Sequence, residues 1–151
     1  MKLLDNLLIA TFLIAICASP IRATAQNDVR SSITGACPSP AEIQPIHLYG
    51  LWQAEFGNMR TQAIIRLGRH PEWTGSVRGE IDRAGVKTKV AGDVDQGELA
   101  LDESTDGRTI SATWFGLVVA SSCGKEIKGT WTDHINNIST SFVLRKQAGW
   151  Q

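Results

Sequence analysis

The chain has 151 residues, and its 15 Lys and Arg balance 15 Asp and Glu, so the formal net charge is zero. No run of one charge sign stands out, which argues against a nucleic-acid binder and against a polybasic membrane anchor. The length suits one domain with its own hydrophobic core.

Residues 1–25 have the pattern of an export signal. Lys2 gives a positive start, residues 7–18 form a short apolar run, and Ala23-Thr24-Ala25 has the small-x-small form that signal peptidase cuts. The run is shorter than the roughly 20 residues of a membrane-spanning helix. We therefore predict a secretory signal peptide, a mature chain from Gln26, a secreted or periplasmic location, and no membrane span after cleavage.

The three cysteines fit this location. Cys17 lies inside the signal, and lipid modification there is disfavoured because Ile16 stands where that processing takes a small residue. Cys37 and Cys123 are predicted to form one disulfide in an oxidising compartment. A nucleophilic Cys123 is the alternative, but no cysteine-hydrolase signature surrounds it.

Residues 26–47 are predicted to form an extended N-terminal arm. They are polar and carry Pro38, Pro40 and Pro45, and Cys37 would tie them to the rest of the protein. The domain itself is predicted to span residues 48–146, and residues 147–151 form a C-terminal tail.

From Leu48 onward, apolar and polar residues alternate with a period of two, which is typical of strands with one buried face. Glycine after a polar residue supplies the positive φ of tight hairpins, as in Arg83-Ala84-Gly85 and Asp95-Gln96-Gly97. The predicted strands cover residues 51–56, 61–67, 75–82, 86–95, 98–102, 110–114, 127–131 and 142–144.

Eight short strands joined by hairpins predict an all-β fold, a small up-and-down antiparallel β-barrel or a strongly curled sheet. Eight strands are enough to close a barrel whose interior is filled by side chains or holds one small ligand. Glycines at inward positions have two interpretations, coiling points of the sheet or room for a ligand, and the first is favoured. These glycines are Gly75, Gly79, Gly92 and Gly129.

Gly50-Leu51-Trp52 opens the first strand, and Arg145 follows the last core residue of the final strand. This arrangement resembles the lipocalin and avidin group of eight-stranded barrels. The resemblance implies that Trp52 and Arg145 pack together and close one end of the barrel. It also implies that Trp114 and Trp131 are wall residues around a small apolar or amphipathic ligand.

The sequence offers little catalytic chemistry. The three histidines, His47, His70 and His134, lack the spacing of a metal site and are predicted to lie on solvated loops. No inward carboxylate is predicted, and no G-x-S-x-G elbow is present. We therefore predict a protein that is not an enzyme and that has no metal or cofactor.

Aromatic residues suggest a contact surface. Trp73 lies at a predicted loop-to-strand junction, and the apolar run of residues 115–119 breaks the period of two. This run is predicted to be a loop packed over the barrel mouth or an exposed surface, and Trp73, Phe115 and Leu117 are predicted to form a ligand or partner rim.

The first functional hypothesis is a secreted or periplasmic binding protein without catalysis, holding a small apolar molecule inside the barrel. The alternative is a protein-binding module, for instance an inhibitor of an exogenous hydrolase such as lysozyme, with contacts on loops near residues 57–60, 70–73 and 115–123. A structural secreted protein is a further alternative. A hollow barrel interior favours the small-ligand hypothesis, and a filled interior favours the protein-binding module.

Overall fold

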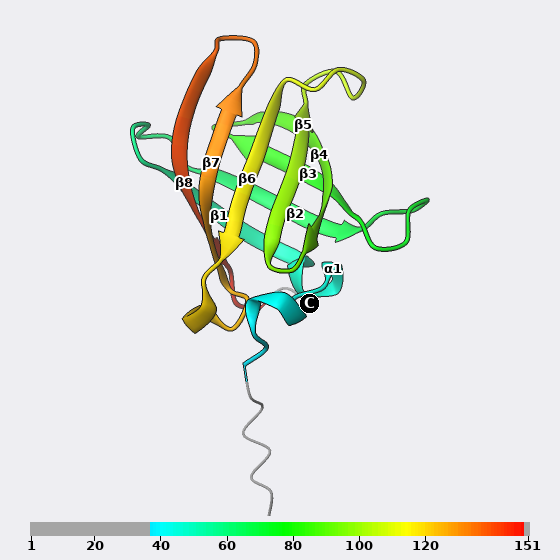
Figure 1. The fold of residues 1–151 in the computed structure, drawn as a ribbon. Helices are drawn as coiled ribbons and strands as arrows, with labels where there is room; N and C mark the ends of the chain where they lie inside the picture. Colours follow the sequence, from blue (N-terminus) through cyan, green and yellow to red (C-terminus); the bar gives the residue numbers. More distant parts are fainter. Residues whose placement is uncertain (1–36, 150–151) are drawn as a thin grey trace, which may run out of the picture. The chain divides into compact units, whose positions relative to one another are not determined.

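The computed structural model describes residues 37–149, and in them eight antiparallel strands form a closed barrel (Figure 1). Each strand pairs with the next, and β8 pairs with β1 to close the sheet. The predicted signal peptide, Cys17 and residues 26–36 lie outside the described residues. The strands are β1 (Gly50–Phe56), β2 (Ala63–Arg69), β3 (Val77–Arg83), β4 (Val86–Asp95), β5 (Glu98–Ser104), β6 (Ala112–Val118), β7 (Glu126–Asp133) and β8 (Ile138–Lys146).

Two hairpins have the predicted turn chemistry. Ala84 and Gly85 have φ of 52° and 89°, and Gln96 and Gly97 have φ of 48° and 85°. Two successive residues at positive φ make a turn whose twist matches that of the flanking strands. The closed barrel and its hairpins confirm the fold predicted from the alternation.

The interior of the barrel is built from every second residue of the strands. In β5, for example, Leu99 and Leu101 are buried, whereas Glu98 and Asp102 on the opposite face are exposed. Burial of these apolar side chains supplies most of the driving force for folding. The largest fully buried apolar side chains are Trp52, Trp114, Phe142, Leu48, Ile65, Ile81, Leu99, Leu101, Ile127 and Leu144.

The prediction for residues 115–119 is wrong where it expects a loop. These residues continue β6 to Val118, and burial alternates regularly through Trp114, Phe115 and Gly116. The period of two disappears from the sequence here because outward positions carry Phe115 and Leu117, so both faces of the strand are apolar.

The α1 end is the end of the barrel where β1 begins, and the segment before β1 covers it (Figure 1). Ile43 and Leu48 of this segment are buried in the core. The disulfide between Cys37 and Cys123 joins the segment to the connection between β6 and β7, which confirms the predicted pair. The opposite end, where β1 finishes, is the loop end.

The described part of the predicted arm is not wholly extended. It contains a 3₁₀ turn, η1 (Pro40–Glu42), and a short helix, α1 (Pro45–Leu48), and a second 3₁₀ turn, η2 (Ala120–Ser122), precedes Cys123. A proline stands at the start of both η1 and α1, where its fixed φ suits a helical turn and its missing N–H is not needed. The same prolines that suggested an extended arm therefore begin these two turns.

Three of the four glycines singled out in the sequence lie where two backbones approach closely. A Cβ on Gly79, Gly92 or Gly129 would collide with the backbone of the neighbouring strand, at Arg66, Ala100 and Phe115 respectively. These glycines fit the interpretation as coiling points of a tightly curved sheet. Gly75 lies before β3, in the loop, with a φ of 93°.

Candidate functional site

A charged cluster lies inside the barrel near the loop end. Glu103, at 2% exposure, is the most buried charged side chain among the described residues. The Arg83 guanidinium donates two parallel hydrogen bonds to its carboxylate, of 2.5 and 2.6 Å. Thr88 Oγ1 donates to the Oε1 atom at 2.8 Å. The Nε1 atoms of Trp114 and Trp131 donate to Oε2 at 3.0 and 3.2 Å. These five residues are called the Glu103 cluster.

The prediction that no carboxylate points inward is wrong. Leu99, Leu101 and Glu103 share one face of β5, and continued alternation puts the glutamate inside. The predicted strand ends at Asp102, one residue too early, so the prediction does not assign Glu103 to the inward face. Strand alternation was therefore the signal that could have found it.

Burial raises the pKa of the Glu103 carboxyl, but the hydrogen bonds and positive charge of Arg83, helped by Thr88 and Trp114, outweigh this effect. The pKa of Glu103 consequently lies below its ordinary value, and the group is a carboxylate at neutral pH. All its neighbours in the cluster are donors, so the arrangement stabilises the charged form and gives the carboxylate no proton to transfer.

Aromatic rings surround the Arg83 guanidinium. Its Cζ atom lies 5.0 Å from the ring centroid of Trp131, 5.6 Å from that of Trp114 and 5.8 Å from that of Phe56. The Nε atom of Arg83 is buried and has no hydrogen-bond partner among the described residues. The cation thus lies against ring faces, where the aromatic quadrupole attracts it.

The predicted wall residues Trp114 and Trp131 are both buried, and they belong to a packed aromatic group. Trp114 lies 5.0 Å from Phe142 and 5.5 Å from Phe56 between ring centroids, and Phe56 lies 5.6 Å from Trp131. Edge-to-face and tilted pairs at these separations are favourable. The interior near the loop end is therefore occupied by the protein's own side chains.

The predicted contact between Trp52 and Arg145 is not present. Trp52 is fully buried near the α1 end, and its Nε1 donates to the Leu48 carbonyl at 2.7 Å. Arg145 lies on the outer wall, where its guanidinium bonds Glu55 and Glu126 at 2.6 and 3.1 Å. Leu144 points inward, so alternation must turn Arg145 outward.

Lys146 stands in the place that the family resemblance gave to Arg145. Its Nζ atom lies 5.8 Å from the ring centroid of Trp52 and donates to the His47 carbonyl oxygen at 2.6 Å. The pKa of Lys146 is lowered by burial and, to a smaller extent, by Lys125. A lysine thus links the end of β8 to the short helix α1.

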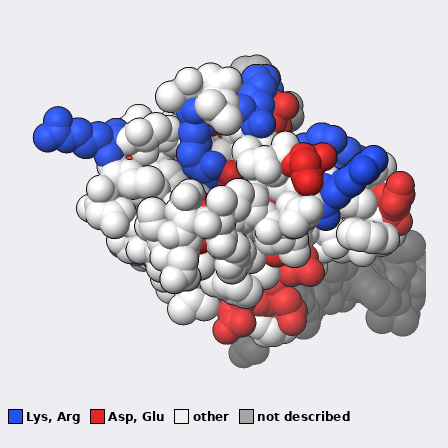
Figure 2. Space-filling view, turned by 90° about the horizontal axis from the view of Figure 1, so that it is seen from above, with Lys and Arg blue, Asp and Glu red and all other residues white. Residues whose placement is uncertain are grey.

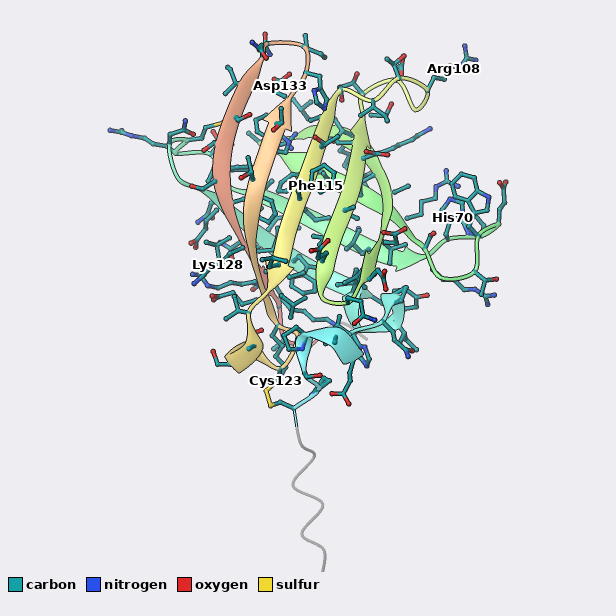
Figure 3. All side chains as sticks on the ribbon, in the orientation of Figure 1. His70, Arg108, Phe115, Cys123, Lys128 and Asp133 are labelled. Carbon is teal, nitrogen blue, oxygen red and sulfur yellow. A yellow bond between two sulfur atoms is a disulfide. The ribbon has the colours of Figure 1, made fainter. Side chains whose placement is uncertain are left out.

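Trp73 does not join Phe115 in one rim. It lies in the loop between β2 and β3, at the α1 end, and its ring stacks on His70 with centroids 4.6 Å apart. His70, labelled on this loop in Figure 3, is buried rather than solvated as predicted, and its Nδ1 accepts backbone N–H bonds from Glu72 and Trp73.

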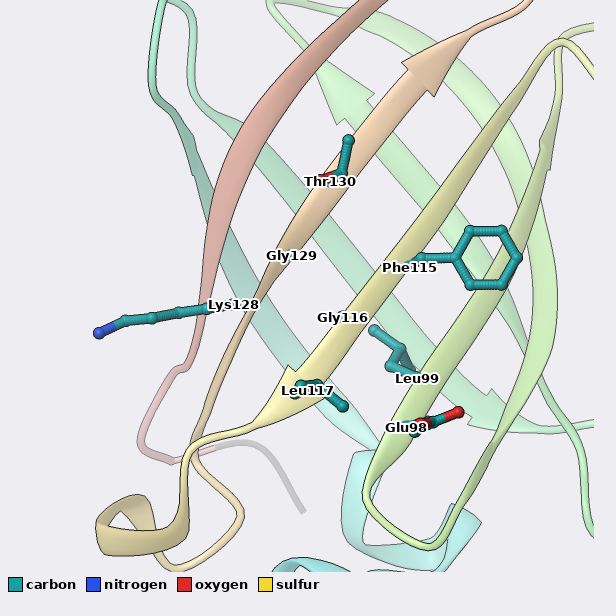
Figure 4. A pocket seen from close by; sticks show the side chains of 8 residues that line it. All are labelled: Glu98, Leu99, Phe115, Gly116, Leu117, Lys128, Gly129 and Thr130. Carbon is teal, nitrogen blue, oxygen red and sulfur yellow. The ribbon is translucent and has the colours of Figure 1, made fainter.

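Phe115 and Leu117 form an apolar patch on the outer wall. Both point outward from β6 and are 63% and 61% exposed. Beside them lies an open hollow of about 410 Å³ (Figure 4). Phe115, Leu117 and this hollow are called the β6 patch. The hollow is lined by Glu98, Leu99, Phe115, Gly116, Leu117, Lys128, Gly129 and Thr130.

A second hollow, of about 270 Å³, lies on another part of the outer wall and differs in its chemistry. Charged side chains line much of it, and Lys87 and Glu80 pair across it at 2.7 Å. At the loop end, residues other than Lys, Arg, Asp and Glu cover most of the visible surface, and the charged residues lie mainly toward its periphery (Figure 2). The β6 patch is therefore distinguished by two large apolar side chains at adjacent outward positions.

Among residues 37–149, no cluster of three or more His, Cys, Asp or Glu side chains has the geometry to hold a metal ion. Within that same range, no helix has the length and apolar composition to cross a membrane. No protein-family model matches the chain, and no curated protein matches it significantly.

Proposed function

We propose that this protein is a non-catalytic binding module that contacts another protein through the β6 patch. The observation that carries the proposal is the exposure of Phe115 and Leu117, 63% and 61%, side by side on the outward face of a regular strand. Large apolar side chains grouped on a surface usually mark a site for a partner or ligand. Neither side chain is needed to fill the interior.

A protein partner suits the patch better than a small molecule inside the barrel. The inward aromatic rings already contact one another, with Trp114 and Phe142 at 5.0 Å. The hollow beside the patch is open and lies outside the barrel, whereas sites for small molecules enclose most of their ligand. A small apolar ligand in the interior is therefore the weaker proposal, because it would have to displace packed side chains.

A role without catalysis agrees with the state of the buried carboxylate. Glu103 is held as an anion by five hydrogen bonds. A general acid or base needs a pKa near the working pH, and the pKa of Glu103 moves away from neutrality. The Glu103 cluster is accordingly proposed to stabilise the barrel.

A secreted or periplasmic location belongs to the same proposal. The Cys37–Cys123 disulfide is compatible with an oxidising compartment. Amino-terminal sequencing of the exported protein should begin at Gln26. A chain that retains Met1 in its mature form would contradict export through a cleaved signal.

Site-specific photo-crosslinking tests the contact surface even when the partner is unidentified. p-Benzoylphenylalanine replaces Phe115, the protein is exported by its own host, and the cells are irradiated. Ile64, 43% exposed on β2, provides a matched position on another part of the wall. We expect protein adducts from position 115 and none from position 64. Adducts from neither position, or equal adducts from both, would rule out the β6 patch as the contact surface.

The hydrolase-inhibitor version of the proposal has its own test. Lysozyme activity is measured with the wild-type protein and with the Phe115→Ser/Leu117→Ser double variant. Inhibition by the wild-type protein that is lost in the variant supports an inhibitor. Equal inhibition by both would place the contact elsewhere, and none would remove lysozyme as the partner.

A further inference from the structure

The charges on either side of the β6 patch differ in sign. Glu98 of β5 and Lys128 of β7 both pair in register with Leu117, one on each side of it. Glu98 has no ion pair among the described residues, and the exposed Lys128 pairs with the partly buried Glu126 at 3.0 Å. The patch is therefore an apolar stripe with an acidic side and a basic side.

The same difference in charge sign extends to β4 and β8, the strands that lie beyond β5 and β7. On the β4 side, Asp93 and Asp95 are exposed beyond β5. On the β8 side, Arg145 lies beyond β7, about half exposed, and it pairs with Glu126 and with Glu55. The acidic side of the patch thus has carboxylates on two strands, without an ion pair among the described residues, and the basic side has cations on two strands that share Glu126.

We infer that the β6 patch binds a second copy of this chain in a symmetric dimer whose twofold axis runs parallel to β6. Such an axis exchanges the β5 side for the β7 side, so Glu98 of each copy faces Lys128 of the other. A twofold axis perpendicular to β6 within the contact plane would instead bring like charges together. The charges therefore select one of the two orientations.

The shape of the patch suits the same axis. In Figure 4 the ring of Phe115 leans over β5, whereas Gly129 and Thr130 on the β7 side leave the hollow without a large side chain. The twofold axis sets each Phe115 ring opposite this part of the other copy. The open hollow of about 410 Å³ offers space for an aromatic ring at this place.

The dimer is expected to be weak, because two large apolar side chains on a curved wall give a contact near the small end of the range for specific interfaces. This inference rests on the proposed function, since it names the partner of the same patch. Binding of a second copy also shields Phe115 and Leu117 from water when the protein has no other partner.

Sedimentation equilibrium between about 5 and about 200 µM tests the dimer, with charge swaps as the decisive variants. Glu98→Lys and Lys128→Glu should each raise the dimer Kd about tenfold, because each change breaks two symmetry-related contacts. The combined Glu98→Lys/Lys128→Glu variant should recover most of the affinity, since opposite charges again face each other. Glu80→Lys/Lys87→Glu, an exchanged pair elsewhere on the wall, should leave the Kd unchanged.

Three results would overturn the inference. They are a monomer at every concentration, a combined variant no better than the single variants, and a dimer that persists in Phe115→Ser/Leu117→Ser. The proposed function fails differently, through the absence of any adduct at position 115. A monomeric wild-type protein that crosslinks there to another protein removes the dimer and leaves the binding module.

Discussion

The two faces of β6 differ in what their side chains do. The inward face carries Trp114 and Val118, which are buried in the core, and the Trp114 indole also donates a hydrogen bond to Glu103. The outward face carries Phe115 and Leu117, which are as apolar as their neighbours and yet mostly exposed. Folding explains the first face completely and leaves the second without a purpose inside the molecule.

Inner and outer side chains of β6 should therefore respond to mutation in opposite ways. Changes to the inner face should cost stability, because they leave cavities or unpaired buried groups. Changes to the outer face should cost little stability and should alter binding instead. Matched pairs of residues on the two faces make this contrast measurable.

The largest difference is expected between two tryptophans. Trp52 is fully buried and Trp73 is 62% exposed. Trp52→Ala should lower the free energy of unfolding by about 3–5 kcal/mol, since a large core side chain is lost. Trp73→Ala should lower it by less than about 1 kcal/mol. Urea unfolding followed by circular dichroism measures both, and equal losses would show that the barrel interior is assigned wrongly.

Two glutamates give the next largest contrast. Glu103→Ala leaves the Arg83 cation without its partner in a largely buried site and should cost about 3 kcal/mol, the lower end for a buried pair because Arg83 is partly exposed. Glu80→Ala removes an exposed pair with Lys87 and should cost at most about 1 kcal/mol. A loss below about 1 kcal/mol for Glu103→Ala would mean that the cluster does not stabilise the barrel.

Acid should remove part of the same contribution. The pKa of Glu103 is lowered in the folded protein, so its ionised form stabilises the fold above the ordinary pKa of 4.5, and this stability is lost as pH falls through the folded value. The difference in unfolding free energy between wild type and Glu103→Gln should therefore shrink between pH 7 and pH 3. Urea titrations at several pH values measure it, and a constant difference would contradict an ionised Glu103.

Much of the barrel could be predicted from the sequence, because strands with one wet face leave a period of two. The prediction failed where that period carried too little information. In β6 the outward residues Phe115 and Leu117 are apolar, so the alternation disappears after Trp114 and the second half of the strand is predicted as a loop or an exposed surface. The contact predicted between Arg145 and Trp52 is wrong because Leu144, the neighbour of Arg145, occupies the inward face of β8.

The Glu103 cluster shows a different limit. Strand parity indicates that Glu103 points inward, but nothing in the sequence says that Arg83, 20 residues earlier, and Trp131, 28 residues later, meet its carboxylate. That meeting depends on the register of strands around the closed barrel. Conversely, the disulfide was predictable, because only Cys37 and Cys123 remained to pair.

The smallest effect on stability is expected at the β6 patch. Measuring this effect is the most direct test of whether Phe115 and Leu117 contact a partner rather than stabilise the fold. The free energy of unfolding is measured for wild type and Phe115→Ser/Leu117→Ser at low micromolar concentration, where self-association adds little stability. We expect a difference within about 1 kcal/mol, since each exposed change costs about 0.5 kcal/mol or less. A loss of about 3 kcal/mol or more would show that Phe115 and Leu117 belong to the folded core, and the contact surface would be wrong.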